Sequence, residues 1–172
     1  MRRGYIQVYT GNGKGKTTAA LGLALRAAGA GLKVFIVQFI KKRRCSEHAS
    51  LARFRDSITL QQFGKGCILK RKANPSDRKA AHSGLGEVKR AITSGDYDLV
   101  ILDEASVAVH LHLITAEDLL TLMADKPRGI ELVITGRYAD ERVMAEADLV
   151  TEMREIKHYR KKGVKARMGI EY

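Results

Sequence analysis

Short apolar runs alternate with longer amphipathic stretches along the whole chain. Runs of strand length followed by segments with helical spacing are typical of a parallel sheet with helices on both faces. We predict strands over residues 5–9, 33–39, 58–63, 99–102, 132–134 and 149–151. We predict helices over residues 17–28, 77–93, 116–124 and 140–147, a loop over 64–75, and no clear element over 158–172.

Local signals indicate several helix ends. Gly29 and Gly31 follow the first helix and favour its end, because glycine readily adopts the left-handed conformation found there. Ser76 precedes the second helix and Thr115 the third, and both residue types are good N-caps. With no repeat or Pro/Ser-rich linker, the sequence predicts one doubly wound α/β domain over residues 1–172, with a mostly parallel sheet.

A glycine-rich segment lies between the first predicted strand and the first predicted helix. It consists of Gly11, Asn12, Gly13, Lys14, Gly15, Lys16, Thr17 and Thr18. Glycines let such a loop aim backbone N–H groups at phosphate, while Lys16 reaches the phosphates and Thr17 offers a hydroxyl to Mg²⁺. The segment departs from the general pattern G-x-x-x-x-G-K-S/T at Thr10, where a glycine is expected. We predict an ATP-binding P-loop and a P-loop NTPase-like fold; a glycine-rich turn without a ligand is the alternative.

Two carboxylates follow the apolar run at 99–102. In P-loop proteins an acidic residue at the end of a neighbouring buried strand orders Mg²⁺ or its water shell. Ligands of such sheets bind outside the carboxyl ends of the strands, next to the P-loop. We therefore predict a metal role for Asp103 or Glu104, by direct or water-mediated contact; a helix cap or a solvated pair of carboxylates is the alternative.

The chain has a formal net charge of +12, which favours binding of polyanions. Its basic groups at 41–44, 65–72 and 160–167 lack interleaved aromatic residues, so polyphosphate and a generally basic surface are favoured over nucleic acid. No apolar run is long enough for a membrane span, and the N-terminus lacks a signal-peptide pattern, so we expect a cytoplasmic protein. Cys45 and Cys67 lack metal-ligand spacing and are expected to be free thiols.

Several segments share a more specific pattern. They are YTGNGKGKTTAA at 9–20, VQFIK at 37–41, DLVILDE at 98–104, VITGR at 133–137, ADLVTEM at 147–153, KH at 157–158 and GVKARMGIEY at 163–172. On these residues the chain resembles the P-loop type of cob(I)alamin adenosyltransferase, also called ATP:corrinoid adenosyltransferase. The last segment is the most telling, because nucleotide chemistry in general does not require it.

This resemblance implies an alkyl transfer. In the family, a corrinoid cobalt reduced to Co(I) attacks C5′ of ATP, and triphosphate leaves. The resemblance implies that Lys16, the loop N–H groups and Mg²⁺ stabilise the departing triphosphate, with Lys16 and Glu104 as catalytic residues. It further implies that Thr17 and Glu104 hold Mg²⁺, that Arg26 touches the nucleoside, and that the partners are a second copy and an electron-donating flavoprotein.

The chain departs from the family after the third predicted strand. Family members tend to carry an aromatic pair there, whereas this chain has Gly66-Cys67-Ile68-Leu69. Gly66, Cys67 and Leu69 are our candidates for contact with the corrinoid. Two other functions remain open: a P-loop ATPase or phosphotransferase acting on another partner, and an ATP-binding relative without catalysis.

Overall fold

In the computed structural model, which describes residues 3–41, 45–66 and 72–172, six parallel strands form one sheet. The strands are β1 Ile6–Thr10, β2 Val34–Phe39, β3 Ile58–Phe63, β4 Leu99–Asp103, β5 Glu131–Thr135 and β6 Leu149–Glu152. Their order across the sheet is β3-β2-β4-β5-β1-β6. Because every pairing is parallel, the carboxyl ends of β1, β2, β4 and β5 meet at one edge of the sheet.

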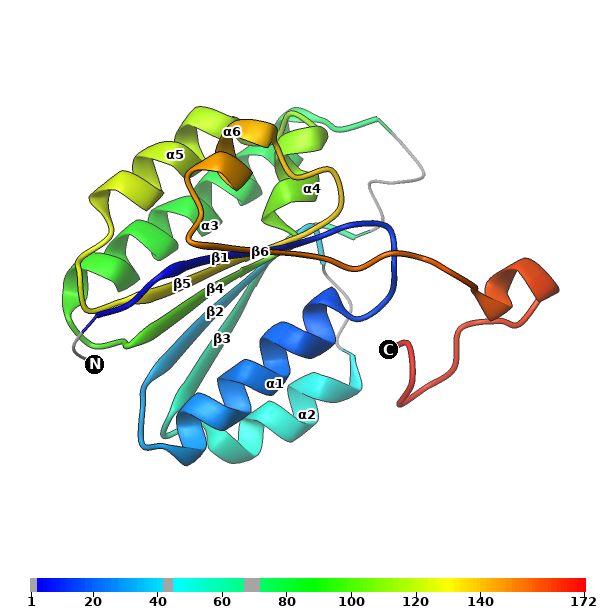
Figure 1. Cartoon of the computed structure of the whole chain (residues 1–172), viewed down its shortest axis with the longest axis horizontal. Helices are drawn as coiled ribbons and strands as arrows, with labels where there is room; N and C mark the ends of the chain where they lie inside the picture. The colour runs from blue at the N-terminus through cyan, green and yellow to red at the C-terminus, as the bar shows by residue number, and fades with distance from the viewer. Residues whose placement is uncertain (1–2, 42–44, 67–71) are drawn as a thin grey trace.

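Helices cover both faces of this sheet (Figure 1). They are α1 Lys16–Gly29, α2 Ser46–Leu51, α3 Pro75–Ser94, α4 Ala105–His110, α5 Ala116–Asp125 and α6 Glu141–Ala145, with 3-10 turns η1 Ala52–Phe54 and η3 Tyr159–Lys162. In Figure 1, α1 and α2 lie below the sheet and α3 to α6 lie above it, which confirms the predicted doubly wound α/β architecture. Among the described residues, no helix is long and apolar enough to cross a membrane.

Two hydrophobic cores lie on the opposite faces of the sheet. Val100 and Leu102 of β4 belong to the core between the sheet and helices α3 and α5. Leu99 and Ile101 belong to the core between the sheet and α1. Strands β2 and β4 are buried along their whole length, as expected for central parallel strands covered on both faces. Strand β6, at the edge, is exposed at every residue. The ends of β2 and β4 are therefore held in the interior, where they can support a site.

The predicted strands and helices are all present, with ends that shift by at most two residues. Thr115 caps α5 as predicted, because its hydroxyl accepts the N–H of Asp118 at 3.1 Å. The predicted start of α3 at Ser76 is wrong. Asn74 is the cap, since its side chain accepts the N–H of Asp77 at 3.1 Å, and Pro75 begins the helix. Proline suits this position because the first N–H groups of a helix have no partner within it.

The sequence pattern does not predict α2, α4 or η3. Each has only four to six residues, which is too short to establish a helical period of apolar residues. In addition, α4 begins directly after Glu104, whose φ of 62° lies in the left-handed region. Such a start has no signal in the sequence, because residues other than glycine rarely adopt this conformation.

Replacing Asn74 by alanine is expected to lower the free energy of unfolding by about 1 kcal/mol, because the Asp77 N–H loses its side-chain acceptor. Chemical denaturation followed by circular dichroism gives this free energy. Ser76→Ala is the matched control: the Ser76 hydroxyl only donates to Asn74 on the surface, so its loss should change stability by less than about 0.5 kcal/mol. Equal losses in both variants would contradict the role of Asn74 as the cap.

Candidate active site

The P-loop connects β1 to α1 through glycines in the left-handed region. Gly11 has a φ of 93°, and Gly15, the N-cap of α1, has a φ of 119°. Residues with a Cβ are strained in this region. Thr10 has no such requirement, because it is still the last residue of β1 and pairs with Glu152 of β6. This explains why the chain departs from the general P-loop pattern at that position.

The chain that follows β6 packs directly against the P-loop. The Gly13 N–H donates to the Met153 carbonyl oxygen at 2.6 Å. A Cβ on Gly11 would lie 2.5 Å from that oxygen, and a Cβ on Gly13 would lie 2.6 Å from it. Close approach therefore requires glycine at both positions. The conformation of the loop depends on a segment near the other end of the sequence as well as on its own residues.

Lys16 lies at the start of α1 with its ammonium turned back over the loop. Its Nζ donates to the carbonyl oxygens of Gly11 at 2.6 Å and Gly13 at 2.7 Å. Burial lowers the pKa of Lys16; the charge of Glu104 opposes this change and that of Arg137 adds to it. A cation above a glycine-rich loop, at the positive end of a helix dipole, is the arrangement that binds phosphate.

Asp103, at the end of β4, is 1% exposed and accepts hydrogen bonds from four side chains. Its Oδ1 accepts from the hydroxyls of Thr17 and Thr135, each at 2.8 Å. Its Oδ2 accepts from the Gln38 amide at 3.1 Å and from the Lys41 ammonium at 2.7 Å. A buried carboxylate is tolerated only when it is paired and hydrogen-bonded in this way. Asp103 thus links α1, β5, β2 and the turn after β2.

Glu104 follows Asp103 directly but faces the cavity beside the P-loop. Burial raises the pKa of the Glu104 carboxyl, and the negative charge of Asp103 adds to this effect. Three cations that act on the same carboxyl, Lys41, Lys16 and Arg137, oppose the shift. The carboxyl ends of the strands thus bring two acidic and three basic side chains together.

Thr17, Asp103 and Glu104 supply one hydroxyl and two carboxylates beside the P-loop. Oxygen donors of this kind suit Mg²⁺, which binds through few protein ligands and keeps several waters. Thr17 and Asp103 are in direct contact, and Glu104 opens onto the cavity. The donor set therefore fits the metal expected from the sequence.

A cavity of about 1140 Å³ opens beside the P-loop. One wall consists of P-loop residues 12–18 and the adjoining face of α1, and a second comes from residues 45–50 at α2. The third wall comes from the C-terminal segment, residues 158–172, for which the sequence predicts no element. In Figure 1 this segment leaves β6, extends to the right and turns back toward α1. The cavity exceeds the roughly 1,000 Å³ of large ligand pockets, so it can hold a nucleotide and leave space beside it.

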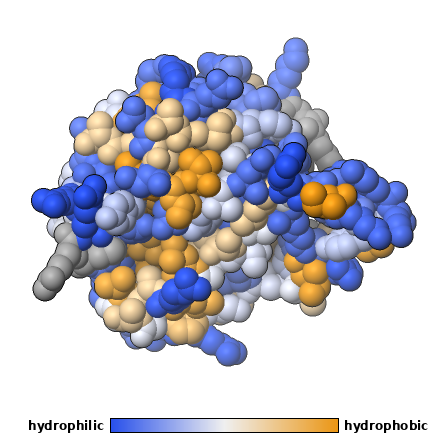
Figure 2. Space-filling model, viewed as in Figure 1, coloured by the Kyte–Doolittle hydropathy of each residue, from blue (hydrophilic) through white to orange (hydrophobic). Residues whose placement is uncertain are grey.

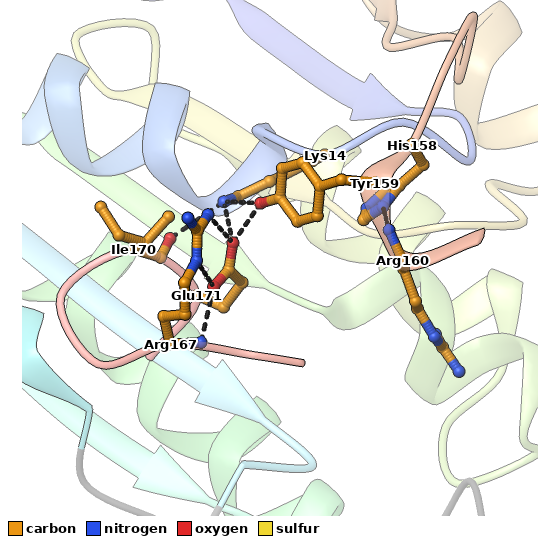
Figure 3. Close-up of polar contacts among 7 residues, drawn as sticks. All are labelled: Lys14, His158, Tyr159, Arg160, Arg167, Ile170 and Glu171. Atoms are coloured by element: carbon orange, nitrogen blue, oxygen red, sulfur yellow. Dashed lines mark hydrogen bonds and ion pairs between the residues drawn. The ribbon is translucent and has the colours of Figure 1, made fainter. Parts of the chain in front are cut away.

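A polar cluster ties the C-terminal segment to the P-loop (Figure 3). Lys14 Nζ donates to the Tyr159 hydroxyl at 3.1 Å, to the Ile170 carbonyl at 3.0 Å and to Glu171 Oε1 at 3.0 Å. Glu171 also accepts from the Tyr159 hydroxyl and from the Arg167 N–H. These hydrogen bonds, first that of Tyr159 and then those of Arg167, hold the pKa of Glu171 well below its usual range. Lys14, which the sequence predicts as an ATP contact, is thus bonded to the C-terminal segment.

The remaining predicted residues lie elsewhere or outside the described parts of the chain. Arg26 is exposed in the last turn of α1 and is not among the described residues that line the cavity. Gly66 has a φ of 92°, and its N–H donates to the Ile40 carbonyl at 3.3 Å. Cys67 and Leu69 lie outside the described residues. The roles of Arg26 and of the three corrinoid candidates stay predictions.

Sequence reasoning missed four side chains of this site. Gln38 and Lys41 belong to VQFIK, and Thr135 and Arg137 belong to VITGR; both segments supported the resemblance without receiving a role. Each segment ends a strand of the parallel sheet, at the edge that carries the P-loop. That shared position is the signal that could have found them.

This fold, with its glycine-rich loop, buried lysine and carboxylates on the neighbouring strand, defines a P-loop nucleotide-binding protein. The family model described as ATP:corrinoid adenosyltransferase BtuR/CobO/CobP matches residues 2–172. The chain belongs to this family, and it is therefore a transferase.

Individual relatives agree with the family model. A corrinoid adenosyltransferase of Escherichia coli (strain K12) is 36% identical over 170 residues, which cover 99% of this chain and 86% of the relative. A corrinoid adenosyltransferase of Pseudomonas aeruginosa is 34% identical over 171 residues, covering 99% and 84%. A corrinoid adenosyltransferase of Salmonella typhimurium is 36% identical over 170 residues, covering 99% and 86%. The similarity thus extends over the whole of the described site.

Glu171→Gln is expected to loosen the C-terminal segment, because Lys14 and Arg167 lose a charged acceptor. Hydrogen exchange should become severalfold faster in residues 159–172 and ATP should bind more weakly. Glu155→Gln is the matched control, since Glu155 pairs with Lys161 of the segment and this ion pair does not involve the P-loop. The pKa of Glu171 is lowered, so its contribution is present above the ordinary carboxyl range and is lost as pH falls through the lowered value. Unchanged exchange in Glu171→Gln at neutral pH would contradict this role.

Proposed function

We propose that this chain transfers the 5′-deoxyadenosyl group of ATP to the Co(I) centre of a reduced corrinoid and releases triphosphate. The observation that carries this proposal is that the P-loop lines a cavity of about 1140 Å³. Hydrolysis of ATP needs only water at the phosphates, whereas this transfer needs room for a large second substrate beside the nucleoside. The family match supports the transferase over a P-loop ATPase, a phosphotransferase or a non-catalytic relative.

In this reaction the bond between C5′ and the triphosphate oxygen breaks as the electron pair of Co(I) forms the cobalt–carbon bond. Negative charge collects on the leaving triphosphate. We propose that the Lys16 ammonium, the loop N–H groups and the N-terminus of α1 stabilise this charge. Lys41 and Arg137 line the same cavity and add positive charge. Interactions of this kind accelerate the transfer because the charge they stabilise grows as the triphosphate leaves.

We propose that Thr17, Asp103 and Glu104 hold Mg²⁺ at the phosphates. The ion supplies further positive charge for the leaving triphosphate. Asp103 orients the Thr17 hydroxyl through their 2.8 Å hydrogen bond, so that an oxygen lone pair is available for the ion or its water. Glu104, which faces the cavity, presents the second carboxylate.

We propose that the corrinoid contacts Gly66, Cys67 and Leu69. We also propose that Arg26 contacts the nucleoside of ATP. Support for these four roles comes from the resemblance alone. The same holds for the flavoprotein that donates electrons and for the cytoplasmic location.

We further propose that two copies pair through the edge strand β6. Every residue of β6 is exposed, and Leu149 and Val150 are each 44% exposed. Apolar side chains gather in the middle of the face shown in Figure 2, where β6 runs across the front in Figure 1. An exposed, partly apolar edge strand offers unpaired backbone groups and apolar area to a second chain.

The function is tested anaerobically with chemically reduced cob(I)alamin, Mg·ATP and the purified protein. The visible spectrum follows formation of adenosylcobalamin, and analysis of the phosphate products identifies the leaving group. Adenosylcobalamin and triphosphate in equal amounts are expected. Release of ADP and phosphate would instead support an ATPase, and tight ATP binding without any product would support the non-catalytic relative.

Lys16→Ala is expected to lower kcat/KM for ATP by at least about a hundredfold, because one preorganised cation at the leaving group is lost. ATP binding, measured by calorimetry, should weaken in parallel. Lys89→Ala removes an exposed lysine of α3, on the other side of the sheet from α1, and should leave both values unchanged. Normal turnover by the Lys16 variant would overturn the assignment of the phosphate site.

Val150→Lys should shift the protein from dimer to monomer, because it puts a like charge on both copies of the edge strand. Sedimentation velocity at one protein concentration compares the variant with the unchanged chain. A monomeric unchanged chain, or a variant that stays dimeric, would show that β6 does not form the interface.

A further inference from the structure

Lys41 contacts two of the side chains assigned to the metal. Its Nζ lies 2.7 Å from Asp103 Oδ2 and 3.3 Å from Thr17 Oγ1. The side chain of Asp103 is 1% exposed and that of Lys41 is 26% exposed, so the contact lies at the inner end of the cavity. A cation of the protein itself thus contacts the oxygens that suit a divalent cation.

The turn that carries Lys41 is built under strain. Ile40 has a φ of 67°, in the left-handed region, which is a marked outlier for a β-branched residue. The backbone of Gly64 packs against this turn so closely that a Cβ there would lie 2.2 Å from the Ile40 carbonyl oxygen. At this turn the Lys41 N–H donates to the Phe39 carbonyl oxygen at 2.6 Å, and the Lys41 side chain reaches Asp103. Strain of this kind persists only where the surrounding structure fixes it, and it gathers at functional sites.

Hydrogen bonding of the Asp103 carboxylate does not by itself require this contact. Asp103 already accepts hydrogen bonds from Thr17, Thr135 and Gln38, which satisfy both of its oxygens. The Lys41 ammonium adds a full positive charge, and Asp103 and Glu104 both act on it. Two cations a few ångströms apart repel each other strongly, so a divalent ion and the ammonium cannot both use this carboxylate at full strength.

We propose that Lys41 and the divalent metal compete for Asp103 and Thr17, and that Lys41, when displaced, turns into the cavity to pair with the polyphosphate. This proposal rests on the metal role of Thr17 and Asp103 in the proposed function. A lysine suits the exchange because its ammonium is compact and its stem is flexible. Lys41 also lines the cavity, so the displaced ammonium stays beside the phosphates.

The competition makes metal and polyphosphate binding cooperative. A metal that enters alone must break the contact between Lys41 and Asp103, so the ammonium loses its ion-pair partner. A metal that enters with a polyphosphate gives that ammonium a new anionic partner. The site therefore discriminates against a free divalent ion, and the two ligands strengthen each other through Lys41.

The test measures Mn²⁺ binding by electron paramagnetic resonance in protein without nucleotide or corrinoid. Lys41→Met should bind Mn²⁺ at least about tenfold more tightly than the unchanged protein, because the competing charge is gone. Lys89→Met, which removes one exposed positive charge on the other side of the sheet, should match the unchanged protein. Equal or weaker Mn²⁺ binding by folded Lys41→Met, or no binding by either protein, would overturn the proposal.

A second measurement needs no loss of the Lys41 charge, in case Lys41→Met does not fold. Proton–nitrogen spectra of the lysine ammonium groups identify Lys41 as the signal lost in Lys41→Arg. Mg²⁺ with tripolyphosphate should shift the Lys41 signal and leave that of Lys89 in place. A Lys41 signal that stays unchanged at saturation would contradict the exchange. Because neither measurement contains ATP or corrinoid, the outcome is independent of whether adenosyl transfer is observed.

Discussion

The buried carboxylate of Asp103 is the interaction on which the site depends. A charge at 1% exposure costs several kcal/mol to bury unless donors surround it, and here hydroxyls, an amide and an ammonium do so. These donors come from separate strands and from the first turn of α1. Because each donor needs a defined position, the carboxylate fixes how the P-loop helix sits over the sheet.

Strain accompanies this arrangement at the ends of two neighbouring strands. Ile40 after β2 and Glu104 after β4 both have φ near 60°, although neither is glycine. Each such residue costs on the order of 1–3 kcal/mol, which the packed strands behind it must offset. The two conformations bring Lys41 close to the carboxylates of both Asp103 and Glu104. The packing of the fully buried strands β2 and β4 offsets this strain.

The fold was predictable because its signals are local and repeated. Buried parallel strands give continuous apolar runs, and the glycines of the P-loop indicate a strand–loop–helix unit. The pairing of Lys41 with Asp103 was not predictable, because it depends on a left-handed isoleucine that no propensity favours. The C-terminal wall was not predictable either, since Lys14 and Glu171 meet only through the tertiary fold. Resemblance marked these segments as meaningful, but only the structure gives their contacts.

The packing of Gly11 and Gly13 against Met153 also has a consequence for synthesis of the protein on the ribosome. The glycine-rich loop is translated well before the backbone of Met153 that supports it. A nascent chain whose β6 is still inside the ribosome lacks the hydrogen bond from Gly13 to Met153. It also lacks the C-terminal wall of the cavity. The P-loop therefore gains its full set of supporting contacts only after Met153 has left the ribosome.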